Sequence, residues 1–446
     1  MREAILAAVT TLFLHIPSAA LDLKPCRISG IAARCGAFEV PENRAKAGGR
    51  VLQLNLILLP ARAKARSAVF VLHGGPGAPA TDLAGPFSEG LEAARANQDL
   101  VFVDQRGSGH LNGLRCTAFS EPDDQRLFPP DKVRACRDEL LLRADLTQYN
   151  TANSVEDLDA LRLALGYEKI KLYGLSYGTR LAQAYLAMHA ERVDGVVLVA
   201  AAPLNFSIFN GLSEGIDSSL NRVFVHCRDD ADCKGRFPQL ASDFEALRRR
   251  LSEEPGSGFD ARALELGILF ELYDSSKALR LPGLIHRAQL GMVAPLAATF
   301  HSARRDLFQQ ISVGLHLSIQ CSEDLPFAGP EKGTGIAATL RDEYSICNEW
   351  PLADFPLGLR NPRQSSVPAL IVVGEFDPVT PPACARQVAA AFRKGRVLVV
   401  PGGGHFVSDA QGCTARAIDS FLANGSISPE VVRCIETLGS ADSRSH

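Results

Sequence analysis

The sequence lacks the features that several large classes of protein require. It carries no excess charge of either sign, with a formal net charge of −3 over 446 residues, and it has no sustained basic stripe. Nucleic-acid-binding proteins need such positive charge, so we expect no nucleic-acid partner. The eleven cysteines and ten histidines form no C-x-x-C or H-x-x-x-H pair, the spacings typical of zinc sites. We therefore expect no metal site.

Signals for nucleotide binding are also missing. No glycine-rich loop ends in G-K-[ST], as a Walker A loop must. The stretch GSGHLNG (107–113) starts like a dinucleotide-binding fingerprint, but Asn112 stands where the third glycine should be. There is no internal repeat, coiled coil or long low-complexity tract. The sequence thus predicts that the protein works without a cofactor.

The first 20 residues predict an export signal. MREAILAAVTTLFLHIPSAA has a short polar start, about a dozen mostly apolar residues, and small residues up to a cleavage point after Ala20. The apolar run is too short to span a membrane comfortably. Glu3 is atypical of the positive start, and a buried N-terminal helix is the alternative. We predict a secreted or periplasmic protein with no membrane contact beyond this signal.

The cysteines fit an oxidising compartment. Proximity in sequence alone suggests five disulfides, although sequence does not fix the connectivity. The pairs are Cys26 with Cys35, Cys116 with Cys136, Cys227 with Cys233, Cys321 with Cys347, and Cys413 with Cys434. Cys384 is left over on a helix-like stretch, and we predict that it is a buried small hydrophobe.

Short apolar strands alternate with helical patterns in two blocks. The predicted strands span residues 51–58, 68–72, 100–104, 170–174 and 195–200 in the first block, and 368–374 and 396–401 in the second. Several are apolar without alternation, as expected for parallel strands covered by helices on both faces. The first block also predicts a helix from Asn153 to Gly166, with Asn153 and Glu156 as a capping box. The pattern predicts an α/β protein with a largely parallel sheet.

From about Pro203 to Ser366 the alternation stops, and the chain becomes helical and loop-rich. Strand–helix alternation then resumes, which indicates a large, mainly helical cap inserted into one fold. We divide the chain into a signal peptide (1–20), the first part of the core (21–203), the cap (204–366) and the second part of the core (367–446).

The stretch GLSYGT (174–179) contains the motif G-x-S-x-G around Ser176. A predicted strand leads into it and a helical pattern follows, which is the context of a nucleophile elbow. Its two glycines leave room in a crowded, strained turn. We interpret Ser176 as a nucleophile; the alternative is an incidental serine in a tight turn.

A serine nucleophile needs a base, and the base needs an orienting carboxylate. In this kind of fold they follow the serine in the order carboxylate, then histidine. Asp377 lies in a loop after a late strand, with Glu375 as the alternative carboxylate, and His405 lies in a loop after the last strand. Only the terminal His446 comes later among the histidines. The predicted triad is Ser176, Asp377 and His405.

Hydrolysis through a serine also needs two backbone N–H groups facing the oxyanion. One should belong to Tyr177, the residue after the nucleophile. The other should come from the loop after an earlier strand, where HGGPG (73–77) lets the backbone approach a substrate closely. We predict Gly75 and Tyr177 as the two donors.

Five stretches together resemble the α/β-hydrolase aminopeptidases, the family of prolyl iminopeptidases and tripeptidyl aminopeptidases. They are HGGPG (73–77), DQRGSG (104–109), GLSYGT (174–179), GEFDPVTPP (374–382) and GGGHF (402–406). HGGPG and DQRG are specific to this branch, whereas G-x-S-x-G is shared with lipases and esterases. Prolyl iminopeptidases usually carry Trp after the nucleophile, so Tyr177, the cysteine-rich cap and the export signal look more like the secreted tripeptidyl aminopeptidase branch.

The resemblance implies an α/β-hydrolase fold and an exopeptidase that binds a free substrate amine through cap carboxylates. The stretch IQCSEDLPF is similar to a recurrent family segment and offers Glu323 and Asp324 for this role. The alternative is a solvated acidic pair beside a disulfide. Arg106 in DQRG is interpreted as a structural ion-pair or loop-bracing residue rather than a catalytic one.

We therefore predict an exported serine exopeptidase that cleaves amide bonds near the free N-terminus of a peptide. One alternative is a carboxylesterase or lipase with the same triad, which would not require a free amine. The other is a non-catalytic binding module on a hydrolase scaffold. The sequence leaves open how many residues are released and what the oligomeric state is.

Overall fold

The computed structural model describes residues 21–120, 126–253, 259–328, 336–407, 409 and 411–441. The predicted signal peptide (1–20) lies outside the described residues. No helix in these ranges is long and apolar enough to cross a membrane.

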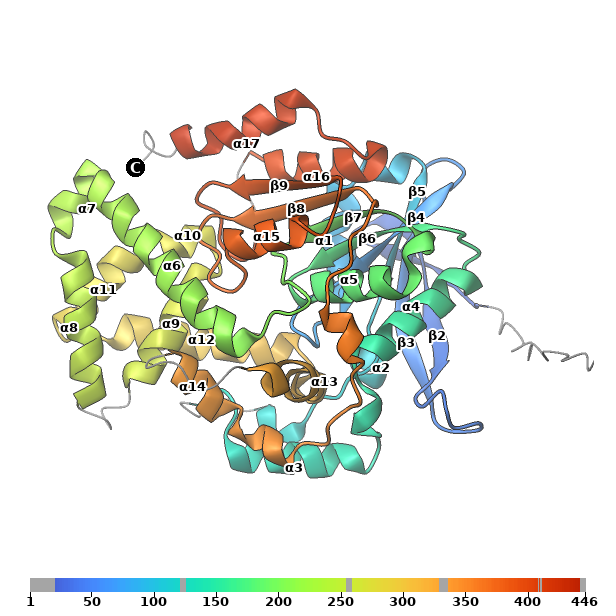
Figure 1. The fold of residues 1–446 in the computed structure, drawn as a ribbon, viewed down its shortest axis with the longest axis horizontal. Helices are drawn as coiled ribbons and strands as arrows, with labels where there is room; N and C mark the ends of the chain where they lie inside the picture. Colours follow the sequence, from blue (N-terminus) through green and yellow to red (C-terminus); the bar gives the residue numbers. More distant parts are fainter. Residues whose placement is uncertain are drawn as a thin grey trace, which may run out of the picture.

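A single nine-stranded sheet forms the centre of the molecule, in the order β1-β2-β3-β5-β4-β6-β7-β8-β9 (Figure 1). The strands are β1 (Lys24–Ile28), β2 (Ile31–Pro41), β3 (Val51–Leu59), β4 (Ser67–Leu72), β5 (Gln98–Val103), β6 (Ile170–Leu175), β7 (Val193–Val199), β8 (Ala369–Gly374) and β9 (Gly395–Val400). β1, β2, β3 and β5 pair antiparallel in succession, whereas β5 and all strands beyond it pair in parallel. The predicted, largely parallel sheet is confirmed.

Seventeen α-helices lie in the described part of the chain. Those before β7 are α1 (Ala84–Gly90), α2 (Gly109–Asn112), α3 (Pro130–Leu141), α4 (Thr151–Ala164) and α5 (Tyr177–His189). Those between β7 and β8 are α6 (Ile208–Asp229), α7 (Ala231–Arg236), α8 (Leu240–Glu253), α9 (Ala261–Leu272), α10 (Ser275–Ala278), α11 (Leu281–Gln289), α12 (Ala294–Gln310), α13 (Val313–Ile319) and α14 (Ile336–Glu343), with a π-helical turn η6 (Gln320–Asp324) after α13. The last are α15 (Pro382–Ala389), α16 (Cys413–Asn424) and α17 (Pro429–Ala441).

Short 3-10 turns complete the described secondary structure. They are η1 (Ala80–Leu83), η2 (Ala94–Ala96), η3 (Thr117–Phe119), η4 (Leu146–Gln148), η5 (Ala190–Arg192), η7 (Leu325–Phe327), η8 (Ser345–Glu349) and η9 (Leu357–Arg360).

The sheet buries both faces, because successive side chains of a strand point to opposite sides. Phe70 and Leu72 of β4 pack in the larger core, which also holds apolar residues of α4, α5 and α15. Val69 and Val71 of the same strand pack on the other face with apolar residues of α1 and α16. All six residues of β5 and of β8 are buried, which explains why β8, and β5 after its first two residues, read as continuous apolar runs rather than alternating ones.

Two details of the N-terminal half differ from the sequence predictions. The hairpin of β1 and β2 was not predicted, because its polar residues interrupt any apolar run, and the disulfide Cys26–Cys35 joins its two strands. α4 starts at Thr151 rather than at Asn153. Asn150 is its N-cap, since its side chain accepts the N–H of Asn153 at 2.7 Å; the capping asparagine therefore lies one turn earlier than predicted.

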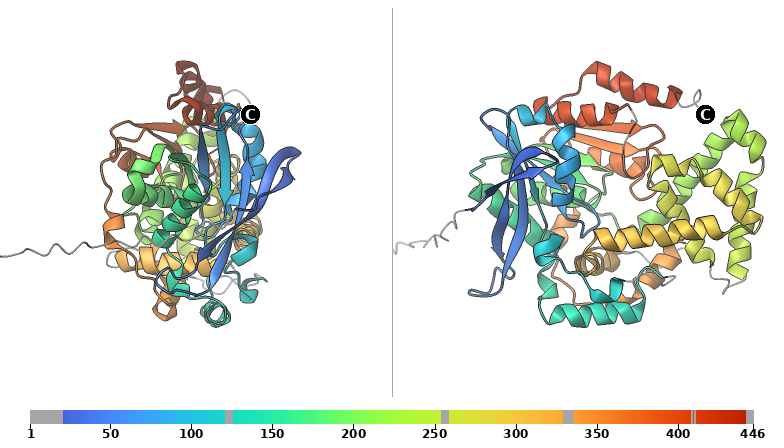
Figure 2. Two further views of the ribbon diagram at one scale, coloured as in Figure 1. Left: turned by 90° about the vertical axis from the view of Figure 1, so that its right-hand side faces the viewer. Right: turned by 180° about the vertical axis from the view of Figure 1, so that it is seen from behind.

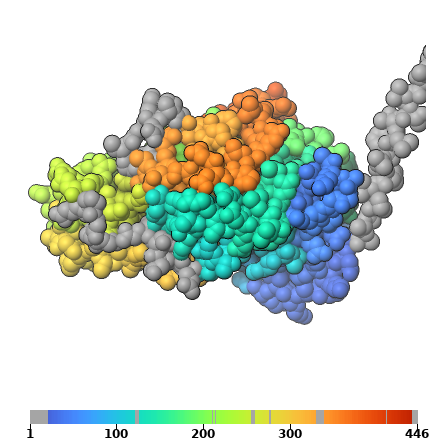
Figure 3. Space-filling model, turned by 90° about the horizontal axis from the view of Figure 1, so that it is seen from below, coloured from blue at the N-terminus to red at the C-terminus, as the bar shows by residue number. Residues whose placement is uncertain are grey.

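The chain between β7 and β8 contains no strand in its described residues, and we call residues 208–360 the helical segment. It extends away from one end of the sheet, with α7, α8 and α11 farthest out (Figures 1 and 2). Its later part returns to the core: Figure 3 shows α14 and η8, in orange, against α3, in teal, where Glu349 pairs with Arg134 and Arg137. The predicted cap boundaries at 204 and 366 stay a prediction.

The five predicted disulfides are confirmed. They join Cys26–Cys35, Cys116–Cys136, Cys227–Cys233, Cys321–Cys347 and Cys413–Cys434. Cys384 is free and half-buried, and burial raises the pKa of its thiol to about 12. This thiol therefore stays protonated at neutral pH, as expected of an unreactive cysteine, but it is not fully buried as the sequence predicted.

Candidate active site

Ser176 lies in a sharp turn between β6 and α5. Its backbone has φ 54° and ψ −121°, a region that a residue with a side chain rarely adopts. Gly178 cannot be replaced without movement, because an added Cβ would lie 2.3 Å from the carbonyl oxygen of Leu72. Gly174 is similarly confined against the backbone of Gly178. This is the strained strand–turn–helix geometry of a nucleophile elbow.

The structure brings the three predicted triad residues together. His405 Nε2 lies 3.0 Å from Ser176 Oγ, and His405 Nδ1 lies 2.9 and 3.0 Å from the two carboxylate oxygens of Asp377. The three side chains follow β6, β8 and β9, whose carboxyl ends meet at one edge of the parallel sheet. Asp377 and His405 are buried. In this arrangement the imidazole can accept the serine proton while the carboxylate fixes its orientation.

Asp377 is held by its own turn as well as by His405. Its carboxylate accepts the N–H groups of Val379 and Thr380, each at 2.9 Å, and the hydroxyl of Thr380 at 2.8 Å. Burial alone would raise the pKa of Asp377, but the charge of His405 and these hydrogen bonds outweigh it and lower the pKa. The alternative carboxylate, Glu375, instead accepts the N–H of Gly402 at 3.0 Å. The contact with His405 therefore belongs to Asp377.

Tyr273, at the end of α9, supports the loop that carries His405, and the sequence reasoning missed it. The ring of Tyr273 lies 4.9 Å from that of His405, and its carbonyl accepts the N–H of Phe406 at 3.0 Å. A side chain at Gly404 would collide with the same carbonyl, at 2.6 Å. An aromatic residue in a helical stretch without a motif gives no signal for this role.

The HGGPG loop lies directly against Ser176. A Cβ added to Gly74 would stand 2.9 Å from Ser176 Cβ. The N–H of Gly74 donates to His73 Nδ1 at 2.7 Å, so it is not free to bind a substrate oxygen. Gly75 has φ +109°, and Tyr177 is the first residue of α5, where an amide has no partner inside the helix. Across the described residues neither of these two predicted donors gives its N–H to another group.

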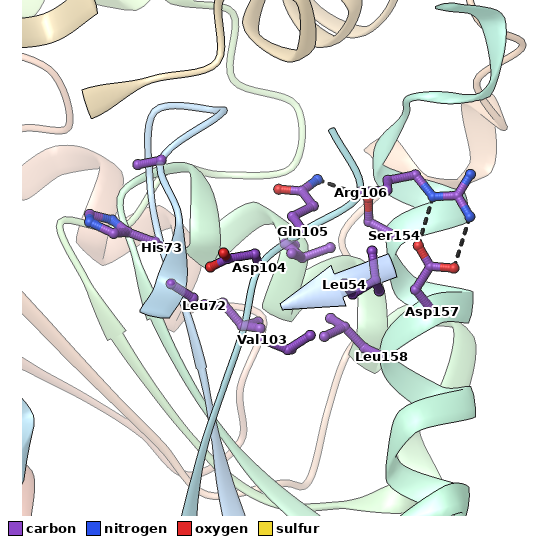
Figure 4. Close-up of a pocket in the computed structure, with 13 residues that line it drawn as sticks. Leu54, Leu72, His73, Val103, Asp104, Gln105, Arg106, Ser154, Asp157 and Leu158 are labelled. Carbon is purple, nitrogen blue, oxygen red and sulfur yellow. Dashed lines mark hydrogen bonds and ion pairs between the residues drawn. The ribbon is translucent and has the colours of Figure 1, made fainter. Parts of the chain in front are cut away.

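Arg106 forms the structural ion pair that the sequence predicted. It is fully buried, and its Nε and Nη2 donate to the two oxygens of Asp157 at 2.7 and 2.8 Å (Figure 4). Its Nη1 also donates to the carbonyls of Glu42 and Gln148. Next to this pair, a cavity of about 10 Å³ lies beneath His73, which is room for one water molecule. Arg106 thus braces the loops behind the site.

Glu323 and Asp324, the predicted amine-binding pair, are 0% and 1% exposed. Glu323 accepts the N–H and the hydroxyl of Thr151 at 2.7 and 2.6 Å. Arg180 donates to Asp324 at 2.6 Å and lies 3.7 Å from Glu323. Burial raises the pKa of both carboxyls, and Arg180 opposes this shift. The two carboxylates therefore face partners within the chain.

No group of three or more His, Cys, Asp or Glu side chains is arranged to hold a metal ion within the described ranges. The residues brought together here carry acid–base and nucleophilic chemistry of their own.

Comparisons with known proteins agree with this geometry. Residues 67–409 match the family described as "alpha/beta hydrolase fold". Serine protease Hip1 of Mycobacterium tuberculosis is 24% identical over 93% of this chain and 91% of that protein. Carboxylesterase B of the same species is 25% identical over 90% and 86%. Tripeptidyl aminopeptidase of Streptomyces lividans is 27% identical, but over only 37% of this chain and 34% of that protein.

These relatives and the family make the protein an enzyme of the serine hydrolase class. Since the match covers most of its length, the chain belongs to the alpha/beta hydrolase fold family.

Proposed function

We propose that this enzyme is an exported serine exopeptidase that hydrolyses amide bonds near the free N-terminus of peptides. The observation that carries the proposal is the continuous contact from Asp377 through His405 to Ser176, beside the N–H groups of Gly75 and Tyr177, which have no acceptor among the described residues. The relatives named as a serine protease and a tripeptidyl aminopeptidase support a peptide substrate. The five disulfides support an oxidising compartment outside the cytoplasm.

The proposed reaction proceeds through an acyl-enzyme. Ser176 Oγ attacks the scissile carbonyl carbon as His405 Nε2 removes its proton. The N–H groups of Gly75 and Tyr177 stabilise the negative oxygen that forms. His405 then gives its proton to the leaving amine, which departs. Water, deprotonated by the same imidazole, attacks the ester carbon. His405 then returns this proton to Ser176 Oγ as the bond to the acyl carbon breaks and the acid is released.

Asp377 would keep His405 in the productive orientation throughout this cycle. Its carboxylate accepts the Nδ1–H, so Nε2 remains free to accept the serine proton. The lowered pKa of Asp377 keeps the carboxylate charged, which stabilises the imidazolium that forms in each transition state.

The free-amine requirement is the finer part of the proposal. An ammonium brought into a dry pocket needs a paired anion. Glu323 and Asp324 remain the predicted anchors, but their internal contacts with Thr151 and Arg180 favour a different role. An amine bound there would have to replace Arg180 as the partner of Asp324.

A panel of fluorogenic amides tests the proposal. Aminoacyl, dipeptidyl and tripeptidyl aminomethylcoumarin amides should be cleaved, and their N-acetylated forms should be spared, because acetylation removes the charge of the amine. Ser176→Ala, run beside the wild-type protein, should cleave none of them. Equal cleavage of free and N-acetylated substrates would contradict an exopeptidase.

A carboxylesterase is the second candidate, and the similarity to carboxylesterase B supports it. Acyl p-nitrophenyl esters added to the same panel separate the two. Turnover of esters without any turnover of peptide amides would favour the esterase. A non-catalytic module would cleave neither and would not react with a fluorophosphonate.

A further inference from the structure

α13 and η6 form one continuous buried helix inside the helical segment, residues 313–324. All of its residues are buried, from Val313 to Asp324. Its second part is a π-helical turn, a form that is rare and frequent at functional sites. This buried helix contacts the core at both of its ends, and each contact leads to one of the two proposed oxyanion donors.

The first end supports the HGGPG loop. The N–H of Ser312 donates to the carbonyl of Gly77 at 3.0 Å. His316 Nδ1 lies 3.3 Å from the carbonyl oxygen of Pro76, and His316 Nε2 lies 2.7 Å from the hydroxyl of Tyr344. A carbonyl can only accept, so Nδ1 carries the proton and the hydroxyl of Tyr344 donates to Nε2.

The imidazole of His316 is suited to this fixed role. Burial lowers the pKa of His316 to about 4, so the ring is neutral at working pH and keeps one donor and one acceptor. The ring also stacks on Phe128, with centroids 5.5 Å apart. His316 thus holds the carbonyl of Pro76, the residue that follows the proposed donor Gly75.

The second end supports the nucleophile turn. The hydroxyl of Thr151 donates to Glu323 at 2.6 Å and lies 2.8 Å from the hydroxyl of Tyr177. Because the Thr151 proton is used on Glu323, the Tyr177 hydroxyl must donate to Thr151. Gln105 in turn donates to Tyr177 at 3.1 Å. A chain of buried hydrogen bonds therefore runs from Glu323 to the side chain of Tyr177.

We propose that the buried helix 313–324 positions the oxyanion site, with His316 fixing the loop of Gly75 and Glu323 fixing Tyr177 through Thr151. The inference rests on the proposed function, since it assigns a role in the same reaction. Oxyanion donors act only within about 2.7–3.1 Å of the oxygen. A small displacement of Gly75 or Tyr177 therefore reduces the stabilisation of the transition state. His316 and Glu323 are positioning residues, because neither touches the reacting atoms.

Two conservative variants test the two ends separately. Tyr344→Phe removes the hydroxyl that orients His316, and Thr151→Val removes the hydroxyl between Glu323 and Tyr177. We expect each to lower kcat about 10-fold, the effect of losing one buried hydrogen bond of about 1.4 kcal/mol, with KM changed less than twofold. p-Nitrophenyl acetate is the substrate, and fluorophosphonate titration counts the active sites. The ester makes the test independent of peptide specificity.

Matched controls separate positioning from stability. Tyr185 is another buried tyrosine, on the same helix as Tyr177, and its hydroxyl donates to Asp159 at 2.7 Å. Tyr185→Phe removes this hydroxyl. It should leave kcat unchanged. Thr151→Ser keeps the hydroxyl and should recover most of the kcat that Thr151→Val loses.

The outcomes separate the inference from the proposed function. Suppose that the wild-type protein hydrolyses the ester. An unchanged kcat per titrated site in both variants would then overturn the inference, and so would a raised KM at constant kcat. Equal loss of kcat in Tyr185→Phe would also overturn it, because the effect would then be general destabilisation. A wild-type protein that turns over no ester and no amide would overturn the proposed function, and the inference with it.

Discussion

The carboxyl edge of the sheet and the helical segment both contribute to the site, but in different ways. The edge supplies the three residues of the proposed triad, Ser176, Asp377 and His405, which follow β6, β8 and β9. The helical segment supplies His316 and Tyr273, which contact the loops of the edge, and Glu323, which contacts Thr151 at the start of α4. In the proposed reaction the edge thus carries the chemistry and the helical segment positions it, so changes in the two regions should have effects of different size.

The largest effect is expected for Asp377→Asn at the carboxyl edge. The amide keeps the shape but cannot accept the Nδ1–H of His405 as a carboxylate does, so the imidazole loses its orienting charge. We expect kcat to fall roughly 10⁴-fold with the folded state intact. Steady-state kinetics on an ester, with circular dichroism as a check of folding, measures it.

Glu375→Gln is the matched control for that substitution. Glu375 lies two residues away and bonds to Gly402 rather than to His405, so its variant should keep most of the activity. If Glu375→Gln were the more damaging of the two, the assignment of the carboxylate would be wrong.

The second largest effect is expected on the stability of the protein at acid pH, through His316 in the helical segment. The pKa of His316 falls from an unfolded value near 6.5 to about 4 in the folded protein. Between these values the unfolded chain binds more protons, so stability is fully present above pH 6.5 and is lost as pH falls towards 4. We expect the loss to reach about 3 kcal/mol in the free energy of unfolding. Urea unfolding at pH 7, 5.5 and 4.5 measures it.

His316→Asn provides the comparison, because asparagine does not titrate. His73 in the core has the same lowered pKa, so some acid sensitivity should remain in this variant. A variant as acid-sensitive as the wild-type protein would show that His316 does not contribute.

The smallest effect is expected for Thr380→Val, again at the carboxyl edge. The hydroxyl of Thr380 donates to Asp377 at 2.8 Å, but two backbone N–H groups bind the same carboxylate. We expect kcat to fall about 10-fold, since one of several hydrogen bonds to a charged group is lost. Thr380→Ser keeps the hydroxyl and should restore it; a serine variant as slow as the valine variant would point to packing instead.

The same division explains how much could be predicted from the sequence. Ser176, Asp377 and His405, which the structure brings together, could be proposed from the sequence because each follows a strand end and the fold fixes their order along the chain. The parallel strands could be predicted because both of their faces are buried, which gives continuous apolar runs in the sequence. The disulfide pairs could be proposed from proximity because each closes a short loop of chain, of 26 residues at most.

The contacts of the helical segment were not predictable in this way. His316 and Tyr273 stand in stretches without a motif, and the core residues that they contact, Pro76 and His405, lie more than a hundred residues away in sequence. Glu323 was singled out by resemblance, but its partner Thr151 was not. Such roles depend on how helices pack, and periodicity tells which face is buried but not what it meets. The hairpin of β1 and β2 was missed for the opposite reason, since its strands lack an apolar run.

The central claim is that Ser176 is the activated nucleophile. Incubation with a fluorophosphonate, followed by proteolysis and mass spectrometry, tests it most directly. We expect one label per chain, on the peptide that contains Ser176, with no label in Ser176→Ala and labelling at least 100-fold slower in His405→Ala, since the general base is worth about 10²–10⁴-fold. Hydrolase activity that persists in Ser176→Ala, or a label on another residue, would contradict the account.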